Sequence, residues 1–250
     1  MKVTNWSGTE LEIDVERTAQ LLDDKALAAR FGTVPAGVQW VAFETINKIT
    51  NAGKKPWTKD TGLPSVWILA MYNPSPDTFV AIPVDPAGKG VVNDAYFGKV
   101  PPERLKVYDK EGFLLFKCDG DHRGKIGIPP GRAREYAGSY SASSKLLTLV
   151  QYDKPKGATD YVNSMWEQQK QPFAGDVVNS YNDGAPAPGK DKLGGFYEIE
   201  TSSPAAALAP RASLVHTHRT FHFAGEISAL DPIAQKALGV SATRIAEGIK

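Results

Sequence analysis

Hydrophobic and polar residues alternate along most of this chain with the two-residue period of β-strands. In residues 9–17, Leu11, Ile13 and Val15 fall on one face and charged residues on the other, which predicts a half-buried strand. The run at 65–72 is apolar throughout and predicts a strand buried in a core. Further strands are predicted at 38–50, 78–84, 104–108, 113–118, 125–128, 134–141, 145–152, 176–181, 196–201 and 213–223.

Only two segments change to a helical period. Residues 18–31 predict a short helix that Gly32 ends. Near the C-terminus, Asp231 is expected to cap a helix that has Pro232 at its first position and Gly239 at its end. Because the strands do not alternate with long helical segments, the fold class is all-β, mainly antiparallel, with a few short helices.

Length and composition fit one folded domain. A β-sandwich of 250 residues is commonly a single domain, so we expect one sandwich over residues 1–250. A net charge of +1 gives no basic field for a phosphate backbone, which argues against nucleic acid as a partner. The single cysteine, Cys118, excludes an internal disulfide and a Cys-rich zinc site. No apolar run reaches the roughly 20 residues of a membrane span, so no membrane association is expected.

The N-terminal residues give an expectation for the cellular location of the chain. No apolar stretch of signal-peptide type follows Met1, which predicts a cytoplasmic location for the chain as written. Strand-like alternation begins almost at once, as if a fold had started upstream. We therefore expect the domain to lack N-terminal strands; with a further N-terminal segment, the expected location becomes periplasmic or secreted.

The last two predicted strands carry the most informative side chains. Alternation puts Glu198 and Glu200 on one face of the first strand, and His216, His218 and His222 on one face of the second. If the two strands are neighbours, carboxylates and imidazoles meet on one polar sheet face, which suits acid–base catalysis. Glu200, Glu198, His216 and His218 are the candidate catalytic residues, and a solvated polar face is the alternative.

A metal site is a further alternative on the same strand. His216, His218 and His222 are two and four residues apart and have the donor atoms for zinc. No fourth ligand stands out, so we expect hydrogen-bonded or solvated histidines and no metal. A zinc-dependent hydrolase stays open as an alternative function.

Candidate ligand contacts lie elsewhere in the chain. A sugar needs amide or carboxylate partners for its hydroxyls and an aromatic face for its C–H surface. Asn47, Trp57 and Asn179 offer these groups, whereas Trp67, inside an apolar run, is interpreted as core. Asparagines also serve as turn residues, so the alternative is structural. No nucleophile elbow, phosphate loop or dinucleotide fingerprint is present, and no cofactor is expected.

The segment "GGFYEIETSSPAAALAPRASLVHTHRTFHFAG" resembles the C-terminal signature of the galactose mutarotase-like superfamily, which includes the aldose 1-epimerases. Together with "FETINKITNAGKKPWTKDTGLPSVWIL" and "GDVVNSYNDG", it is similar, over essentially the whole chain, to an uncharacterised bacterial family within or near that superfamily.

The resemblance implies a supersandwich with a sugar on a concave sheet face. It also implies that Glu200 is the base that removes the anomeric hydroxyl proton, with Glu198 next to it on the same face. The sequence departs from the epimerases in two places: "KDTGLPSVWIL" has no histidine, and Arg211 stands where a glycine is usual.

We therefore expect a carbohydrate-binding protein that acts on a sugar or oligosaccharide at its anomeric centre, by acid–base catalysis. Whether it is an enzyme stays open. The alternatives are a non-catalytic sugar-binding module of a glycan-utilisation system and the zinc-dependent hydrolase.

Overall fold

The structure is a computed structural model that describes all residues 1–250. Its strands are β1 (Lys2–Thr4), β2 (Glu10–Leu21), β3 (Gln39–Asn51), β4 (Trp67–Tyr72), β5 (Thr78–Pro83), β6 (Leu105–Tyr108), β7 (Phe113–Lys117), β8 (Gly124–Ile128), β9 (Tyr136–Ser141), β10 (Leu146–Tyr152), β11 (Val178–Asn182), β12 (Tyr197–Ser202) and β13 (Ser213–Ala224). Its helices are α1 (Asp24–Phe31), α2 (Ile227–Leu238) and α3 (Ala242–Ala246).

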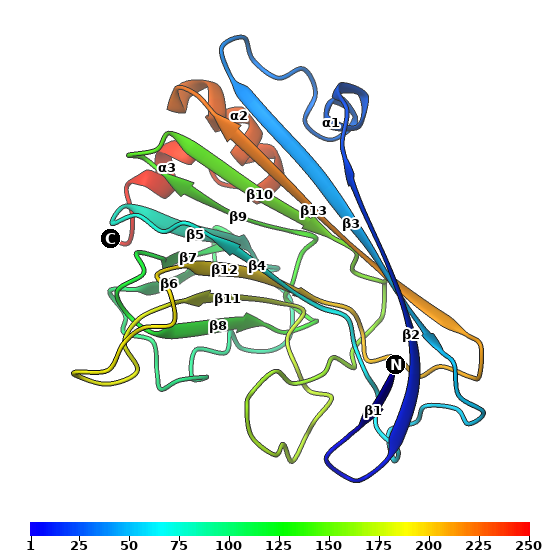
Figure 1. Cartoon of the computed structure of the whole chain (residues 1–250). Coiled ribbons are helices and arrows are strands. Elements are labelled where there is room, and N and C mark those ends of the chain that lie inside the picture. Colours follow the sequence, from blue (N-terminus) through cyan, green and yellow to red (C-terminus); the bar gives the residue numbers. More distant parts are fainter.

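The strands form two sheets of unequal size (Figure 1). The large sheet has nine strands in the order β1-β2-β3-β13-β10-β9-β5-β7-β6, and the small sheet has four in the order β4-β12-β11-β8. All the strand pairs are antiparallel. The prediction of a mainly antiparallel β-sandwich with a few short helices is confirmed.

The space between the sheets is a fully buried apolar core. Leu114 and Phe116 of the large sheet pack in one cluster with Ile126 and Ile199 of the small sheet, and all four side chains are 0% exposed. Along each strand, residues that face this core alternate with residues that face the opposite side of the sheet. The small sheet therefore also carries side chains on its outer face, away from the large sheet.

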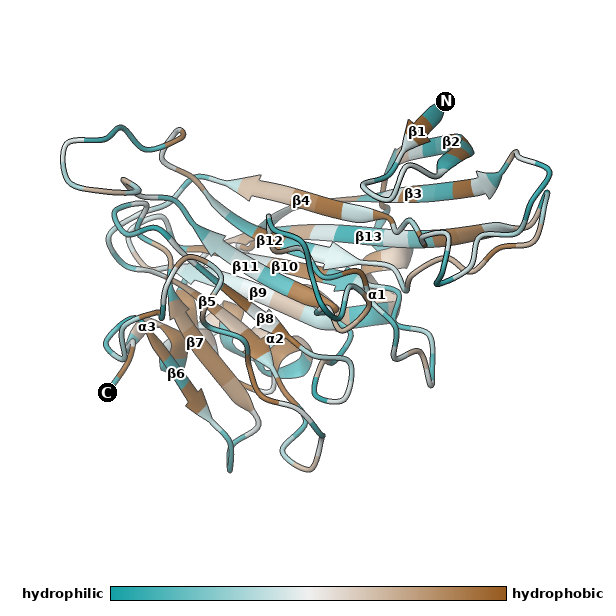
Figure 2. Cartoon of the chain, turned by 90° about the horizontal axis from the view of Figure 1, so that it is seen from below, coloured by the Kyte–Doolittle hydropathy of each residue, from teal (hydrophilic) through white to brown (hydrophobic).

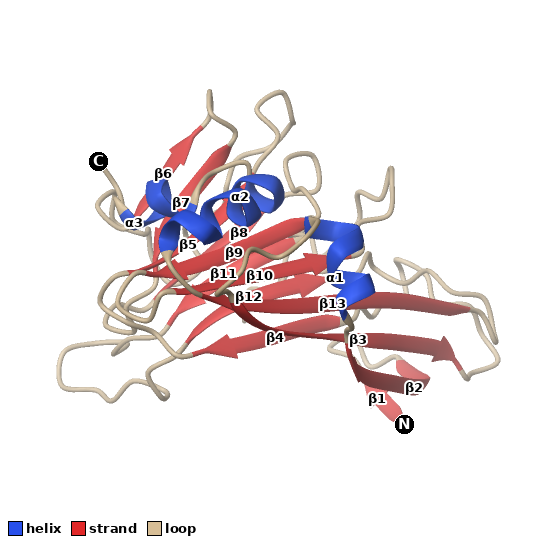
Figure 3. Cartoon of the chain, turned by 90° about the horizontal axis from the view of Figure 1, so that it is seen from above, coloured by secondary structure: helices blue, strands red, loops and turns tan.

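Helices cover the opposite face of the large sheet (Figure 3). Phe31 of α1 meets Phe221 and Phe223 of β13 edge to face, with ring centroids 5.0 and 5.5 Å apart. Hydrophobic residues are concentrated on β5 and β7, whereas the loops are mostly polar (Figure 2). No helix is long and apolar enough to cross a membrane. The molecule is therefore layered: helices, large sheet, small sheet, and an outward face of the small sheet.

Helix positions differ from the sequence prediction. Residues 18–21 continue β2 because they pair with β3 as far as Phe43, and this pairing prevails over a weak helical pattern. Helix α1 begins at Asp24, after Asp23 accepts a hydrogen bond from the Ala26 N–H at 2.8 Å.

The C-terminal helix also begins earlier than predicted. Helix α2 starts at Ile227, so that Pro232 lies inside it and Asp231 does not cap it. The Asp231 carboxylate instead accepts hydrogen bonds from the backbone N–H and hydroxyl of Thr243, both at 2.8 Å, which joins α2 to α3. Gly239 does end the helix, in the left-handed conformation, as predicted.

Strand β4 is a further correction. The apolar run predicted a core strand, but β4 is an edge of the small sheet, with Leu69 41% and Met71 59% exposed. Its apolar side chains therefore border the outward face of that sheet.

The layered packing gives a stability prediction. Leu115 is 0% exposed in the core beneath the helices, so we expect Leu115→Ala to lower the free energy of unfolding by about 2–5 kcal/mol. The matched control, Leu193→Ala, removes a side chain that is 70% exposed and should change it by less than about 0.5 kcal/mol. Denaturant unfolding measures both, and equal effects would contradict this account of the core.

Candidate functional site

The outward face of the small sheet carries two rows of directly paired residues. Residues opposite each other in an antiparallel pair project to the same face. The first row is Leu69, Glu200, Asn179 and Gly127, and the second is Met71, Glu198, Tyr181 and Lys125. Two acids thus project from the inner strand β12, and one base, Lys125, projects from the edge strand β8.

Glu200 is held by two N–H donors. Its Oε2 accepts hydrogen bonds from Lys125 Nζ at 2.7 Å and from Trp67 Nε1 at 2.8 Å. The Lys125 and Glu200 side chains are only 5% and 1% exposed, so their charges compensate each other in a dry environment. This carboxylate is fixed in position and its ionised form is well matched by donors.

Glu198 lies beside Glu200 with no cation of its own. Its side chain is nearly buried, and burial, followed by repulsion from Glu200, raises its pKa well above the usual value for a glutamate. Lys125 opposes this shift but does not cancel it. One proton is therefore retained on the Glu198–Glu200 pair under conditions in which an exposed glutamate is ionised.

A third acid, Asp176, lies near Asn179 on the same face. The Tyr96 hydroxyl donates to Asp176 Oδ2 at 2.6 Å and accepts from Asn179 Nδ2 at 2.9 Å. Burial raises the pKa of Asp176 to about 6. Any side chain at Gly127 would collide with the Asp176 carboxylate and the Asn179 amide, so the absence of a Cβ there lets these groups lie over β8.

Asn179 presents an unused acceptor. Its Nδ2 also donates to the Ile126 carbonyl at 3.1 Å, which fixes the orientation of the amide because an oxygen there would face another oxygen. The Asn179 Oδ1 is buried and has no hydrogen-bond partner. A buried polar atom of this kind is costly unless a ligand or water supplies a donor.

Aromatic rings border the charged groups. Lys125 Nζ lies 4.9 Å from the Trp67 ring centroid and 5.0 Å from that of Tyr96. Farther along, the Arg123 guanidinium lies 4.0 Å from the Phe97 ring, and Phe97 meets Trp166, which is 78% exposed. The site thus combines acids, one ammonium group and aromatic surfaces.

The histidines do not join this site. The acid–base interpretation required the two strands to be neighbours, and this condition is not met because β12 and β13 belong to different sheets. His216 Nε2 and His218 Nδ1 are hydrogen-bonded to the Thr201 hydroxyl, at 3.0 and 2.9 Å. Thr201 projects from β12 on the side opposite to Glu200, because adjacent residues of a strand point to opposite faces. The two histidines are 1% and 2% exposed, inside the sandwich.

The zinc alternative finds no support in this arrangement. His222 bonds to the Thr148 hydroxyl at 2.9 Å, whereas His216 and His218 converge on Thr201. No group of three histidine, cysteine, aspartate or glutamate side chains is placed to hold a metal ion.

Two of the predicted ligand contacts lie away from the site. Trp57 is 3% exposed and packs with Leu11 and Ile49 in an apolar cluster, so its interpretation as an exposed platform is wrong. Asn47 is buried on β3 and donates to the His216 carbonyl at 3.1 Å. Asn179 alone of the three lies on the same face as the glutamates.

Other residues of the site escaped the sequence interpretation. The apolar run at 65–72 predicts a core position for Trp67, yet its indole N–H donates a hydrogen bond to Glu200. Lys125 is the only charged residue of a five-residue strand in which every residue is buried, and a charge in such a strand is itself a signal of a functional or paired group. Tyr96 lies in a long connection without any pattern that predicts its contact with Asp176.

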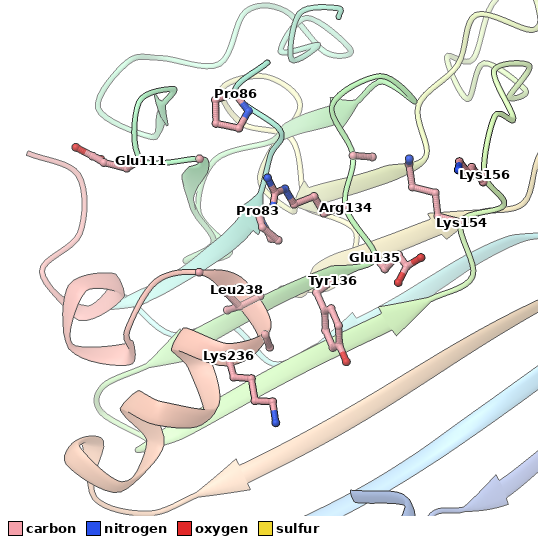
Figure 4. Close-up of a pocket in the computed structure, with 14 residues that line it drawn as sticks. Pro83, Pro86, Glu111, Arg134, Glu135, Tyr136, Lys154, Lys156, Lys236 and Leu238 are labelled. Atoms are coloured by element: carbon pink, nitrogen blue, oxygen red, sulfur yellow. The ribbon is translucent and has the colours of Figure 1, made fainter. Parts of the chain in front are cut away.

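A surface cavity of about 740 Å³ lies on another part of the molecule, where the start of β9, the loop after β10 and the end of α2 meet (Figure 4). Arg134, Lys154, Lys156 and Lys236 are among its lining residues, and neither Glu198 nor Glu200 is. It has no pair of adjacent buried acids, so the face of the small sheet remains the candidate site.

Comparisons with known proteins give one family and a set of solved structures. The profile of a family described as "Family of unknown function (DUF6786)" matches residues 1–249. No curated protein matches the chain. The chain is similar to the Slr1438 protein from Synechocystis sp. PCC 6803 (13% identity, TM-score 0.40, 85% of this chain and 62% of that one). It is also similar to a candidate aldose 1-epimerase from Escherichia coli K12 (10% identity, TM-score 0.44, 83% and 69%). Both TM-scores are below 0.5, so neither structure bears on the ligand of this chain.

The buried histidines predict an acid-sensitive fold. Burial lowers the pKa of His216 to about 4 and of His218 to about 3, whereas the unfolded chain binds these protons near pH 6.5. The unfolded state therefore binds more protons between pH 6.5 and 4, and the free energy of unfolding should fall by a few kcal/mol as the pH drops through this range.

The measurement is denaturant unfolding at pH 7, 5.5 and 4, for the unsubstituted chain and for His216→Gln/His218→Gln. The carboxamides do not titrate, so the double variant should lose less stability on acidification. An NMR titration in which either imidazole protonates near pH 6.5 would contradict the prediction.

Proposed function

We propose a sugar-binding and acid–base role at an anomeric centre for this chain, which belongs to the family of unknown function DUF6786. The observation that carries the proposal is the buried pair Glu198 and Glu200, two carboxyl groups side by side on one sheet face with Lys125 as their only ion-pair partner. Such a pair keeps one proton and one negative charge, which are the acid and the base of a proton-transfer reaction.

The roles follow from the surroundings of each carboxyl group. Glu200, fixed by Lys125 and Trp67, acts as the base that takes the proton from the anomeric hydroxyl. Glu198, whose pKa is raised by burial and by its charged neighbour, acts as the acid that gives its proton to the ring oxygen while the bond from that oxygen to the anomeric carbon breaks.

The reaction is balanced without a cofactor. After ring opening Glu200 carries the proton and Glu198 is ionised. Rotation about the bond that joins the aldehyde carbon to the next carbon turns the other face of the aldehyde toward the ring hydroxyl. Ring closure then returns one proton to each starting group. The product is the other anomer, with no change of oxidation state.

Several features support a sugar as the ligand. The unpartnered Asn179 Oδ1 offers an acceptor to a hydroxyl donor, and Trp67 and Tyr96 supply aromatic surfaces beside the charged groups. The resemblance of residues 194–225 to the mutarotase-like superfamily implies the same ligand class and the same role for Glu200.

A non-catalytic sugar-binding module remains the second candidate. The tight hydrogen bonds of Glu200 favour it, because a carboxylate that is already bound by two donors is suited to positioning a ligand hydroxyl without proton transfer. The two candidates differ in turnover, not in binding, so substitutions that spare binding separate them.

The first substitution is Glu200→Gln. The amide keeps the size of the side chain but cannot accept a proton, so we expect the rate of anomer exchange to fall by about 10²–10⁴-fold while sugar binding changes little. A thermal-shift screen against mono- and oligosaccharides identifies the sugar, and NMR exchange between its anomers gives the rate. The matched control is Glu103→Gln, at an exposed position, which should leave both unchanged.

The outcomes separate the two candidates. Normal turnover in Glu200→Gln would remove Glu200 from the mechanism. Sugar binding without anomer exchange in the unsubstituted chain would favour the binding module.

The second substitution, Trp67→Ala, tests the ligand contact. It removes an aromatic surface and one donor to Glu200, and we expect sugar affinity to fall by about tenfold or more. Trp57→Phe, a conservative change in an apolar cluster away from the site, is the control and should keep the affinity. Titration calorimetry measures both, and unchanged affinity in Trp67→Ala would place the ligand elsewhere.

A further inference from the structure

A third row of residues continues the outward face of the small sheet beyond Glu198. The N–H of Asp183, one residue past the end of β11, donates to the carbonyl of Phe196, one residue before β12, at 3.0 Å. Next to it, the backbone of Arg123, one residue before β8, lies against Gly184. Because side chains alternate along each strand, Phe196, Asp183 and Arg123 project to the same face as Glu198.

Arg123 differs from every other arginine that is shielded from solvent. Its Nε is buried without a hydrogen-bond partner, and its side chain forms no ion pair and donates no hydrogen bond within the chain. The other arginines that are not exposed all donate hydrogen bonds to the chain; they are Arg30, Arg104, Arg132, Arg219 and Arg244. A guanidinium that is partly removed from water without a partner costs free energy, and an anion of the ligand would offset this cost.

The carboxylate of the same row cannot serve as this partner, because other donors already bind it. Asp183 Oδ2 accepts hydrogen bonds from the N–H groups of Gly194 and Gly195, at 2.9 and 3.0 Å. Asp183 Oδ1 accepts one from the Tyr181 hydroxyl at 2.9 Å, and the residue is 0% exposed. The positive charge of Arg123 is therefore left without an ion pair.

Aromatic rings hold the Arg123 side chain in place. Its Cζ lies 4.0 Å from the centre of the Phe97 ring, and this ring meets Tyr181 and Trp166 edge to face, with centroids 5.7 and 6.3 Å apart. A guanidinium that lies over a ring keeps the N–H groups at its margin free. Only Nε is both buried and unbonded, so the two terminal nitrogens are the ones that a ligand can reach.

We propose that Arg123 binds a carboxylate group of the ligand, so that the ligand is a uronic acid or an oligosaccharide of uronic acids. This inference rests on the proposed function, because it adds a second contact to the same sugar. One strand lies between β8 and β12, so the backbones of Arg123 and Glu198 are about 10 Å apart. The carboxylate is thus a substituent of the sugar at a distance from the anomeric centre.

The balance of charge favours a carboxylate over a phosphate group. Lys125 is paired with Glu200, so Arg123 is the one cation of the three rows that lacks an ion pair. A carboxylate carries a single negative charge, and its two coplanar oxygens match the two terminal nitrogens of a guanidinium. A phosphate monoester carries about −1.5 to −2 charges at pH 7, which one arginine does not neutralise.

The first experiment uses the unsubstituted chain. Its ligands are galacturonate and glucuronate, as monosaccharides and as short oligosaccharides, with their methyl esters, the neutral hexoses and the hexose 6-phosphates. The ester keeps the shape of the uronate but removes its charge. Titration calorimetry should show that one of the uronates binds about tenfold or more tightly than its ester and its neutral hexose, because a charged hydrogen-bonded pair is lost.

Substitutions then assign the preference to Arg123. In Arg123→Gln, affinity for the uronate should fall by about tenfold or more, to that of the ester, while affinity for the ester stays the same. Arg123→Lys keeps the charge but not the paired N–H groups, so its affinity should lie between the two. The control is Arg134→Gln, which removes the same charge from an exposed arginine in the cavity of Figure 4 and should change neither affinity.

The outcomes distinguish this inference from the proposed function. Binding and anomer exchange of a neutral hexose, with no preference for its uronate over the ester, would overturn the inference alone. Tighter binding of a hexose 6-phosphate than of the uronate, or an unchanged preference for the uronate in Arg123→Gln, would also overturn it. Absence of binding by every sugar would overturn both. The comparison of uronate with ester needs no substitution, so it decides the matter even if a variant fails to fold.

Discussion

Strand β12 is buried on both faces, and the two-residue alternation of its side chains organises the rest of the molecule. Ile199 and Thr201 face the large sheet, where Ile199 joins the core and Thr201 binds two histidines. Glu198 and Glu200 face the other way. A shift of one residue in its pairing with β4 and β11 would put two carboxylates into the apolar core, so the register of the small sheet is strongly determined.

The chemistry of the site follows from an imbalance of charge among buried side chains. Two carboxyl groups share one ammonium group, that of Lys125, on a face from which most water is excluded. Burial penalises each negative charge, and Lys125 compensates one of them, so the other carboxyl retains its proton. On an open, solvated strand, Glu198 and Glu200 would have the same surroundings and therefore the same acid–base chemistry.

The difference in size between the two sheets has a separate consequence. Four strands cannot cover the inner face of nine, so part of the large sheet projects beyond the small one. At Leu11 and Ile13 this overhang is covered by the loop that carries Trp57. Farther along β2, residues 14–21 are exposed, and they include apolar Val15 and Leu21 as well as charged Glu16 and Arg17.

The sequence by itself determined most of the strands, the fold class and the alternation that puts Glu198 and Glu200 on one face, because these depend on local periodicity. Residues 18–21 show its limit: their helical pattern is weak, and pairing with β3 makes them a strand. Only the tertiary structure decided which faces meet. It separated His216 and His218 from the glutamates, buried Trp57, and brought Lys125, Tyr96 and Asp176 to the site from segments far apart in the chain. Periodicity specifies that side chains share a face, but the order of strands in each sheet, which decides what that face meets, depends on contacts between distant segments.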